Sequence, residues 1–351
     1  MNKKNKKKFK EVNNLRKTLI TTFIILLSVT LTYGLADAVQ GICSQCHTMH
    51  NSQDGSSMAQ TFSGTPLATP QPNLTVSTCL GCHNGQATGA PVIFGTYGTN
   101  STAGGSFRDA DFSTDAKGHN VKDLNDAGIL AVGLEGTLAA TPGAEAGGFT
   151  EPTPTQLTCA GTLGCHGNHD AGAGIAVTGF HHGSYPNAYR FLRFYDGATH
   201  TDILGKGSDD WELNGATATN HNVYYSLSDD NVAARDSISS FCSLCHGGFH
   251  DETDTTSGSA WVRHPTEILL PGTWTPTVDY DRNPFAFNGG DYTGVATNAA
   301  YDATDNPRVA CISCHRAHAT TQDDILRFAY SDMVAGGENT WGCLGCHDAQ
   351  R

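Results

Sequence analysis

Cys311-Ile-Ser-Cys314-His315 is one of five segments in this sequence with the pattern C-x-x-C-H. The other four are Cys43-Ser-Gln-Cys46-His47, Cys79-Leu-Gly-Cys82-His83, Cys242-Ser-Leu-Cys245-His246 and Cys343-Leu-Gly-Cys346-His347. This order is the attachment motif of c-type haem: two thiols bond to one porphyrin, and the histidine that follows ligates its iron. Zinc ribbons also pair cysteines at this spacing, but they do not require histidine after each pair. Five repeats therefore favour haem over zinc or disulfides.

The last two of the twelve cysteines occur in Cys159-Ala-Gly-Thr-Leu-Gly-Cys165-His166. This segment ends in Leu-Gly-Cys-His, as two of the regular motifs do, so we interpret it as the same motif with three residues inserted after the first cysteine. A local disulfide, or a haem attached through one cysteine only, is the alternative. The sequence thus predicts six covalently attached c-type haems, with proximal ligands at His47, His83, His166, His246, His315 and His347.

Ten further histidines compete for the second axial position of these irons. They outnumber the methionines, which indicates coordination by two imidazoles and hence irons without an open site for substrate. His50 and His318 follow a proximal histidine by three residues, so each would reach an adjacent haem rather than its own. The expected distal ligands are His50, His119, His182, His221, His250, His264 and His318. Of His181 and His182, one is expected to face inward; His169 and His200 are interpreted as packing or solvated residues.

The N-terminal 38 residues have the composition of an export signal. Eight Lys and Arg residues precede an apolar run from Leu19 to Leu35, and Ala36-Asp37-Ala38 supplies the small residues that a signal peptidase reads. We expect cleavage after Ala38, with no membrane span left in the mature chain, although a retained anchor is the alternative reading. Residues 39–351 would then form one exported haem-binding domain.

Composition limits both the fold and the partners of this domain. Hydrophobic residues make up 38% of the 351 residues, charged residues 16%, and there are 40 glycines. We therefore expect a mostly irregular, haem-organised fold with short α-helices and few β-strands, and no conventional hydrophobic core. Helices are expected around residues 186–194 and 321–330. The net charge of −13 disfavours binding to nucleic acid.

These motifs resemble the multihaem c-type cytochromes of metal- and sulfate-respiring bacteria. Residues 311–318 and the C-terminal site are similar to the doubled-CXXCH cytochrome domain. The segment from Cys43 to Asn51 resembles the start of outer-surface cytochromes that polymerise into extracellular filaments. The resemblance implies electron transfer through a continuous stack of haems, and, in some members, a distal histidine taken from the next subunit. His50 is the candidate for such a ligand.

The expected function is therefore electron transfer over distance by a non-enzymatic protein, secreted to the cell surface or beyond. A head-to-tail homopolymer is favoured because the first and last motifs lie near the two ends of the chain. Other redox proteins or extracellular electron acceptors would be its partners. The alternatives are a monomeric periplasmic or outer-surface electron shuttle and a multihaem reductase. A reductase requires an iron with an open position, and the surplus of histidines argues against one.

Overall fold

The computed structural model of the chain describes residues 41–61, 63–84, 90–93, 104–107, 117–119, 121–126, 157–207, 221–227, 235–249, 264, 266–270, 279–287 and 307–347. The expected signal segment, residues 1–38, and the candidate ligand His250 lie outside these ranges. Among the described residues, no helix is long and apolar enough to cross a membrane.

The regular elements are short, as the composition predicts. The α-helices are α2 (Cys79–Cys82), α3 (Lys122–Asp126), α4 (Ala173–Ala176), α5 (Ile238–His246), α6 (Cys311–Cys314) and α7 (Cys343–Cys346). Single 3-10 turns occur at η1 (Cys43–Gln45), η2 (Pro72–Leu74), η4 (Phe180–His182), η5 (Tyr189–Phe191), η6 (Gly247–Phe249), η9 (Asp323–Ile325) and η10 (Tyr330–Asp332). Isolated helices this short are not stable on their own, so they depend on packing for their stability.

The strands form four small sheets. Two are hairpins, β1 (Ser52–Gln53) with β2 (Ser56–Ser57) and β5 (Arg193–Tyr195) with β6 (His200–Asp202). A parallel pair joins β3 (Thr158–Ala160) to β4 (Gly164–His166). The largest sheet has the order β10-β9-β8-β7, with β7 (Gly205–Lys206), β8 (Val223–Tyr225), β9 (Ala286–Phe287) and β10 (Pro307–Arg308).

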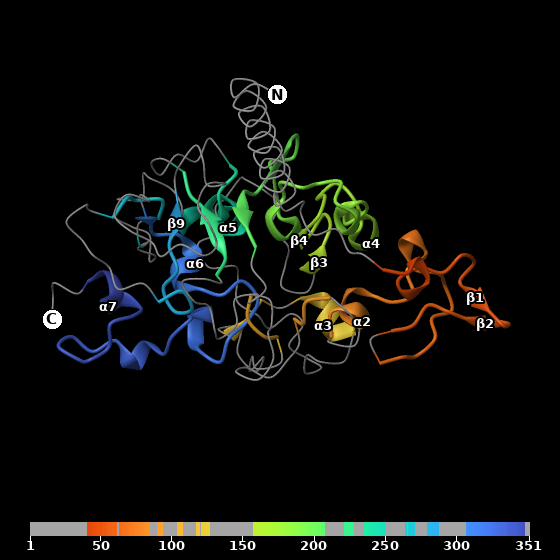
Figure 1. Cartoon of the computed structure of the whole chain (residues 1–351), viewed down its shortest axis with the longest axis horizontal. Helices are drawn as coiled ribbons and strands as arrows, with labels where there is room; N and C mark the ends of the chain where they lie inside the picture. Colours follow the sequence, from red (N-terminus) through yellow and green to blue (C-terminus); the bar gives the residue numbers. More distant parts are fainter. Residues whose placement is uncertain are drawn as a thin grey trace, which may run out of the picture.

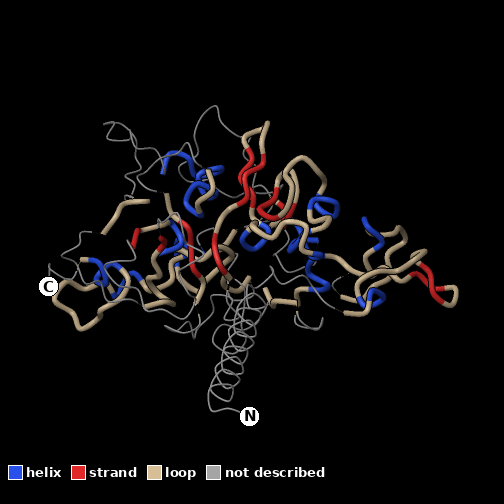
Figure 2. Tube along the Cα trace, turned by 45° about the horizontal axis from the view of Figure 1, so that its top comes forward, coloured by secondary structure: helices blue, strands red, loops and turns tan. Residues whose placement is uncertain are grey.

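The elements follow one another along an elongated molecule (Figure 1). The segment that carries β1 and β2 lies at one end, α7 lies at the other, and β3, β4 and α5 lie between them; the tube in Figure 2 shows the same order from another direction.

Apolar side chains are divided among three small clusters rather than gathered in one core. The largest includes Ile203, Tyr224 and Ala286, and Cys165 packs against it. A second includes Leu80, Phe107 and Leu124, with Cys159 alongside, and a third joins Leu270, Phe285 and Val309 to Cys346. Each cluster thus abuts a cysteine of an attachment motif. The expectation of an irregular fold without a conventional core agrees with this arrangement.

The predictions of helices around residues 186–194 and 321–330 are wrong. Residues 186–194 contain the 3-10 turn η5 and the start of β5, and residues 321–330 contain η9 and the start of η10. In η5 the backbone of Arg190 and Phe191 is left-handed, with φ of 50° and 63°, and in η9 the same holds for Asp324 and Ile325. A left-handed pair cannot continue an α-helix. The hydrogen bonds of these turns explain their conformation, as described below.

Candidate haem-binding site

The paired cysteines occupy one helical turn in three of the motifs. Helices α2, α6 and α7 each begin at the first cysteine and end at the second, so the two thiols and the following histidine are presented by one compact unit. In α2 the turn is capped by Thr78, whose side chain accepts a hydrogen bond from the Gly81 N–H. The motif at Cys242–Cys245 lies at the end of the longer helix α5.

The expanded motif is built differently. Cys159 lies in β3 and Cys165 in the adjacent parallel strand β4, with Thr158 opposite Gly164 and Ala160 opposite His166. A Cβ at Gly164 would lie 2.6 Å from the backbone nitrogen of Ala160, so only glycine fits this close approach. Of the three inserted residues, Ala160 ends β3, and Gly161 and Thr162 lie in the turn between the two strands, while the His166 imidazole still follows directly after the second cysteine.

Five of the six predicted proximal histidines have a second imidazole at a nearly constant spacing. Ring centroids lie 6.1–6.3 Å apart in the pairs His47–His182, His83–His181, His119–His246, His166–His318 and His264–His347. The angle between the ring planes varies from 21° to 83°, so ring stacking does not set this distance. When two imidazoles bind one metal from opposite sides, their ring centroids are separated by two metal–nitrogen bonds of about 2 Å and half the width of each ring. This separation is roughly 6 Å. The paired rings therefore fit a metal held between them.

Hydrogen bonds orient several of these imidazoles for metal binding. The Nδ1 atoms of five of them lie 2.7–3.0 Å from backbone carbonyl oxygens: His47 on Asn73, His83 on Pro91, His119 on Ala317, His166 on Arg190 and His315 on Asp324. Donation from Nδ1 fixes the tautomer and leaves Nε2 as the ligand atom, which is the usual outer-shell arrangement of metal-bound histidine.

Left-handed turns supply three of these carbonyls. The accepting residues Asn73, Arg190 and Asp324 have φ of 56°, 50° and 58°. The turn residue that follows accepts a second bond in each case: Leu74 from the Thr48 N–H, Phe191 from the Gly167 N–H, and Ile325 from the Arg316 N–H. The first, third and fifth motifs thus share one clip that holds the proximal histidine. The sequence carries no common signal for this clip, since its residue types differ.

Burial keeps several of these imidazoles neutral, which is the form that binds a metal. It lowers the pKa of His119 to about 4, with a smaller contribution from the charge of His246. Burial likewise lowers the pKa of His181 to about 4, with His83 as the next cause. Among the thiols, burial raises the pKa of Cys165 to about 11.

Adjacent histidines in η4 serve two different pairs. His181 faces His83 and His182 faces His47, so one dipeptide lies between the first and second motifs. Gly179 and Gly183 flank it with φ of 84° and 75°, which turns the chain sharply on both sides. The sequence analysis selected only His182. The doublet His-His between two glycines was the signal for the second residue.

The remaining candidates have different surroundings. His221 is buried and stacks on Tyr280, with ring centroids 4.4 Å apart; this contact does not assign it to an iron. His50 is exposed, and its side chain makes no hydrogen bond or ring contact with another described residue. For His315, no histidine of the described segments lies opposite its ring at the spacing of the other pairs.

His169 and His200 have packing roles. The Nε2 atom of His169 lies 2.8 Å from the Arg193 carbonyl oxygen, and its Nδ1 atom is buried with no hydrogen-bond partner among the described residues. The Nε2 atom of His200 accepts a hydrogen bond from the backbone N–H of His169. His200 also stacks on Tyr195, with ring centroids 4.5 Å apart.

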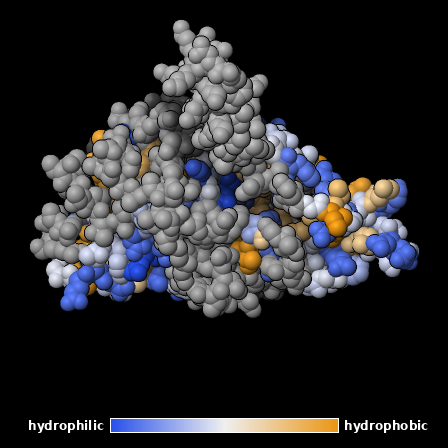
Figure 3. All heavy atoms as spheres, viewed as in Figure 1, coloured by the Kyte–Doolittle hydropathy of each residue, from blue (hydrophilic) through white to orange (hydrophobic). Residues whose placement is uncertain are grey.

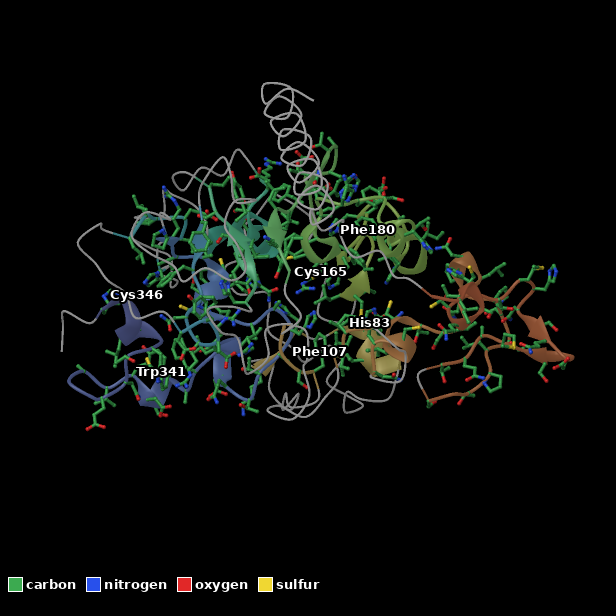
Figure 4. The ribbon with its side chains drawn as sticks, viewed as in Figure 1. His83, Phe107, Cys165, Phe180, Trp341 and Cys346 are labelled. Carbon is green, nitrogen blue, oxygen red and sulfur yellow. The ribbon has the colours of Figure 1, made fainter. Side chains whose placement is uncertain are left out.

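Cysteines of successive motifs interact from one end of the molecule to the other. The largest cause of the shifted thiol pKa is Cys159 for Cys79 and Cys311 for Cys242, with a smaller contribution of Cys165 to the pKa of Cys242. For Cys82 and Cys314, burial raises the pKa most, followed by the charge of Cys46 on Cys82 and the charges of Cys343 and Cys346 on Cys314. In Figure 4, His83, Phe107 and Cys165 lie in the middle of the molecule, and Cys346 lies toward the end that carries α7. The attachment segments therefore form a continuous row in sequence order.

Sequence comparisons with known proteins support the same haem chemistry. The family of the doubled CXXCH motif matches residues 306–351. C-type cytochrome OmcS of Geobacter sulfurreducens is 26% identical, over 87% of this chain and 82% of its own length. Two structures of OmcS nanowires or filaments from the same organism align with 84% of this chain and 85% of theirs, at 19% and 20% identity and TM-scores of 0.47 and 0.43. On its motifs and its sequence relatives, this chain resembles the multihaem c-type cytochromes, and its paired cysteines support covalently bound c-type haem.

Proposed function

We propose that this chain is an exported hexahaem cytochrome that transfers electrons over distance as the repeating subunit of an extracellular filament. The observation that carries the proposal is the set of five imidazole pairs with ring centroids 6.1–6.3 Å apart, each at an attachment motif. Haem supplies the redox-active iron. An iron with an imidazole on each side exchanges electrons without binding substrate.

A continuous electron path is supported by the row of attachment segments. Because cysteines of consecutive motifs interact, the porphyrins bonded to them would be neighbours. The protein's contribution is to hold each iron between neutral imidazoles and to fix the order of the haems along the molecule. The six proximal ligands would be His47, His83, His166, His246, His315 and His347.

Assembly into a filament is supported by the incomplete site at His315. His318 follows the fifth proximal histidine by three residues and faces His166 of another motif. His50 follows the first proximal histidine at the same spacing; it is exposed, and it comes two residues before β1, whose segment lies at one end of the molecule. No histidine of the described segments fills the second position at His315, so by analogy His50 would ligate the haem at His315 of the next subunit. A contact of this kind is heterologous and produces an open filament.

Both ends of the molecule also expose apolar side chains. Ile42 and Met49 are 69% and 80% exposed near the first motif, and Tyr330 and Val334 are 75% and 58% exposed near the last. Figure 3 shows hydrophobic residues on the surface at the end that carries β1 and β2. Burial of these side chains against another copy would stabilise the head-to-tail contact.

Electron microscopy of the secreted protein, together with a His50→Ala variant, tests the assembly. The wild type is expected to form filaments of one repeating subunit. The variant is expected to remain dispersed and to gain one high-spin haem, whereas a His200→Ala control would keep both properties of the wild type. Dispersed wild-type particles with all irons low-spin would favour a monomeric electron shuttle. A wild-type haem that is high-spin and binds nitrite rapidly would favour a reductase.

A further inference from the structure

Arg316 is a buried residue that has no role in the electron transfer proposed above. It follows the proximal residue His315, and its side chain is 1% exposed. A Cβ at Gly105 would lie 3.2 Å from the Arg316 Cδ atom, which places this side chain beneath the segment 104–107. A guanidinium in the protein interior is costly unless it is paired and hydrogen-bonded.

The hydrogen bonds of Arg316 are incomplete. Its Nη2 donates to the Asp281 carboxylate at 2.6 Å and lies 3.4 Å from the Asp281 carbonyl oxygen. Its Nε and Nη1 atoms are buried and have no hydrogen-bond partner among the described residues. Three of the five N–H groups of a guanidinium belong to these two atoms. One side of this buried cation is therefore satisfied, and the other is not.

A second buried arginine adds positive charge at the same place. Arg327 is 4% exposed, and its Nη1 donates to the Asp281 carbonyl oxygen at 3.0 Å. Its Nε donates to the carbonyl oxygens of Ile312 and His315, at 2.6 and 3.1 Å. Two guanidinium groups thus meet at one aspartate. A negatively charged group with two acceptor atoms would complement this arrangement.

We propose that the Nη1 donors of Arg316 bind a propionate carboxylate of a bound haem. This inference rests on the proposed function, which supplies the haem. Attachment through the paired cysteines uses the vinyl groups of the porphyrin and leaves its two carboxylates available. Hydrogen bonds between a guanidinium and a carboxylate are charge-assisted and therefore strong. The surroundings are those of haem ligands: His315 is the preceding residue, and Phe107 of the overlying segment stacks on His318, with ring centroids 4.8 Å apart.

Arg316 would then act as a positioning residue that also adjusts a reduction potential. The positive charge favours the reduced state of a nearby iron, because reduction adds an electron to the haem. Removal of this charge is expected to lower the potential of the haem whose carboxylate it binds. This decrease in reduction potential should be largest for one haem.

The test compares Arg316→Gln and Arg316→Lys with the control Arg282→Gln. Arg282 is an exposed neighbour whose guanidinium pairs with Asp279 at 3.3 Å and lies 4.4 Å from the centre of the Trp341 ring. Each holoprotein is titrated by spectroelectrochemistry. Redox-difference infrared spectra are also recorded with isotope-labelled haem carboxylates. We expect Arg316→Gln to shift one component to lower potential, and both Arg316 variants to shift a labelled carboxylate band.

The control is expected to match the wild type in both measurements. If Arg316→Gln does not accumulate with all its haems, Arg316→Lys decides, since lysine keeps the charge but has no donor at the Nη1 position. The assignment would be overturned if every Arg316 variant that is recovered with all its haems gave the same titration curve and the same infrared spectrum as the wild type. A wild-type potential that depends on added acetate would also overturn it, because the carboxylate would then come from solution. A wild-type protein that carries no haem would instead refute the proposed function. Intact mass measurement of the wild type distinguishes this outcome from a failure of the Arg316 assignment.

Discussion

The imidazole of His166 lies opposite that of His318, with ring centroids 6.2 Å apart, although the two residues belong to different attachment segments. His166 ends β4, and His318 follows α6. An iron bound between them would further tie together two segments that already share an apolar cluster, through Cys165 on one segment and Ala310 and Ile312 on the other. The prosthetic groups would in this way take over the role that a hydrophobic core has in other proteins.

Replacement of His318 by alanine tests this pairing. We expect the haem at His166 to lose its second nitrogen and become high-spin, so that one iron in six gains the ability to bind cyanide. Electron paramagnetic resonance and optical spectra measure the change. A His200→Ala variant serves as the control, because the His200 Nε2 accepts a backbone hydrogen bond and is not available to iron. A fully low-spin His318→Ala protein would contradict the assignment.

The histidine doublet in η4 predicts two separate effects. His181→Ala should open the haem at His83, and His182→Ala should open the haem at His47, because each imidazole faces a different proximal ring. The double variant should therefore contain two high-spin irons, while each single variant contains one. Quantitative spin counting on the three proteins checks this. Only one high-spin iron in the double variant would show that the doublet serves a single haem.

Gly105 predicts a steric effect close to the same haem sites. Its φ is +97°, and a Cβ at this position would overlap the carbonyl oxygen of Ala319. Gly105→Ala should therefore destabilise the protein by more than the roughly 1–2 kcal/mol that a left-handed alanine costs. Gly55→Ala isolates the backbone contribution, since Gly55 has φ of +80° and nothing within 4 Å of an added Cβ. Thermal unfolding of the two variants measures the difference, and equal losses would contradict the predicted overlap.

Glu267 predicts a pH dependence of stability. Its side chain is fully buried, and it accepts hydrogen bonds from the hydroxyls of Ser226 and Ser237 and from the Leu227 N–H. Burial raises the pKa of Glu267 above its ordinary value of 4.5, against the opposing effect of these donors. The native state then holds a proton more tightly than the unfolded state, so stability falls as pH rises from 4.5 through the raised pKa.

A Glu267→Gln variant should lose this contribution, because the amide does not titrate. Its unfolding midpoint should decline less between pH 4.5 and neutral pH than that of the wild type. Glu338→Gln, at an exposed position, provides a matched control that should follow the wild type. Parallel pH profiles for the Glu267→Gln variant and the wild type would contradict this account of the buried carboxyl.

The sequence was sufficient for the chemistry because covalent haem attachment needs a fixed local pattern. Cys343-Leu-Gly-Cys346-His347 indicates this chemistry without knowledge of any distant residue. The scarcity of regular structure followed from composition in the same way. The turn at Arg190, in contrast, is left-handed, and its carbonyl oxygen accepts a hydrogen bond from the His166 imidazole. This hydrogen bond joins residues far apart in the chain, so the sequence around Arg190 does not indicate it.

Distal partners were only partly predictable for the same reason. His119 lies opposite His246, but its orientation comes from a hydrogen bond with the Ala317 carbonyl oxygen, 198 positions along the chain. Such a contact cannot be derived from spacing. The second member of the doublet, His181, was missed because neighbouring side chains were not expected both to face inward. The left-handed glycines Gly179 and Gly183 on either side of η4 permit both imidazoles to do so.

Intact mass analysis of the protein purified from its native producer, combined with alkylation of free thiols, tests the central claim most directly. The account predicts a mature chain that carries six haem additions and no alkylated cysteine, with peptide mapping that assigns one haem to Cys159 and Cys165. Fewer haem masses, or cysteines that react with the alkylating reagent, would contradict it.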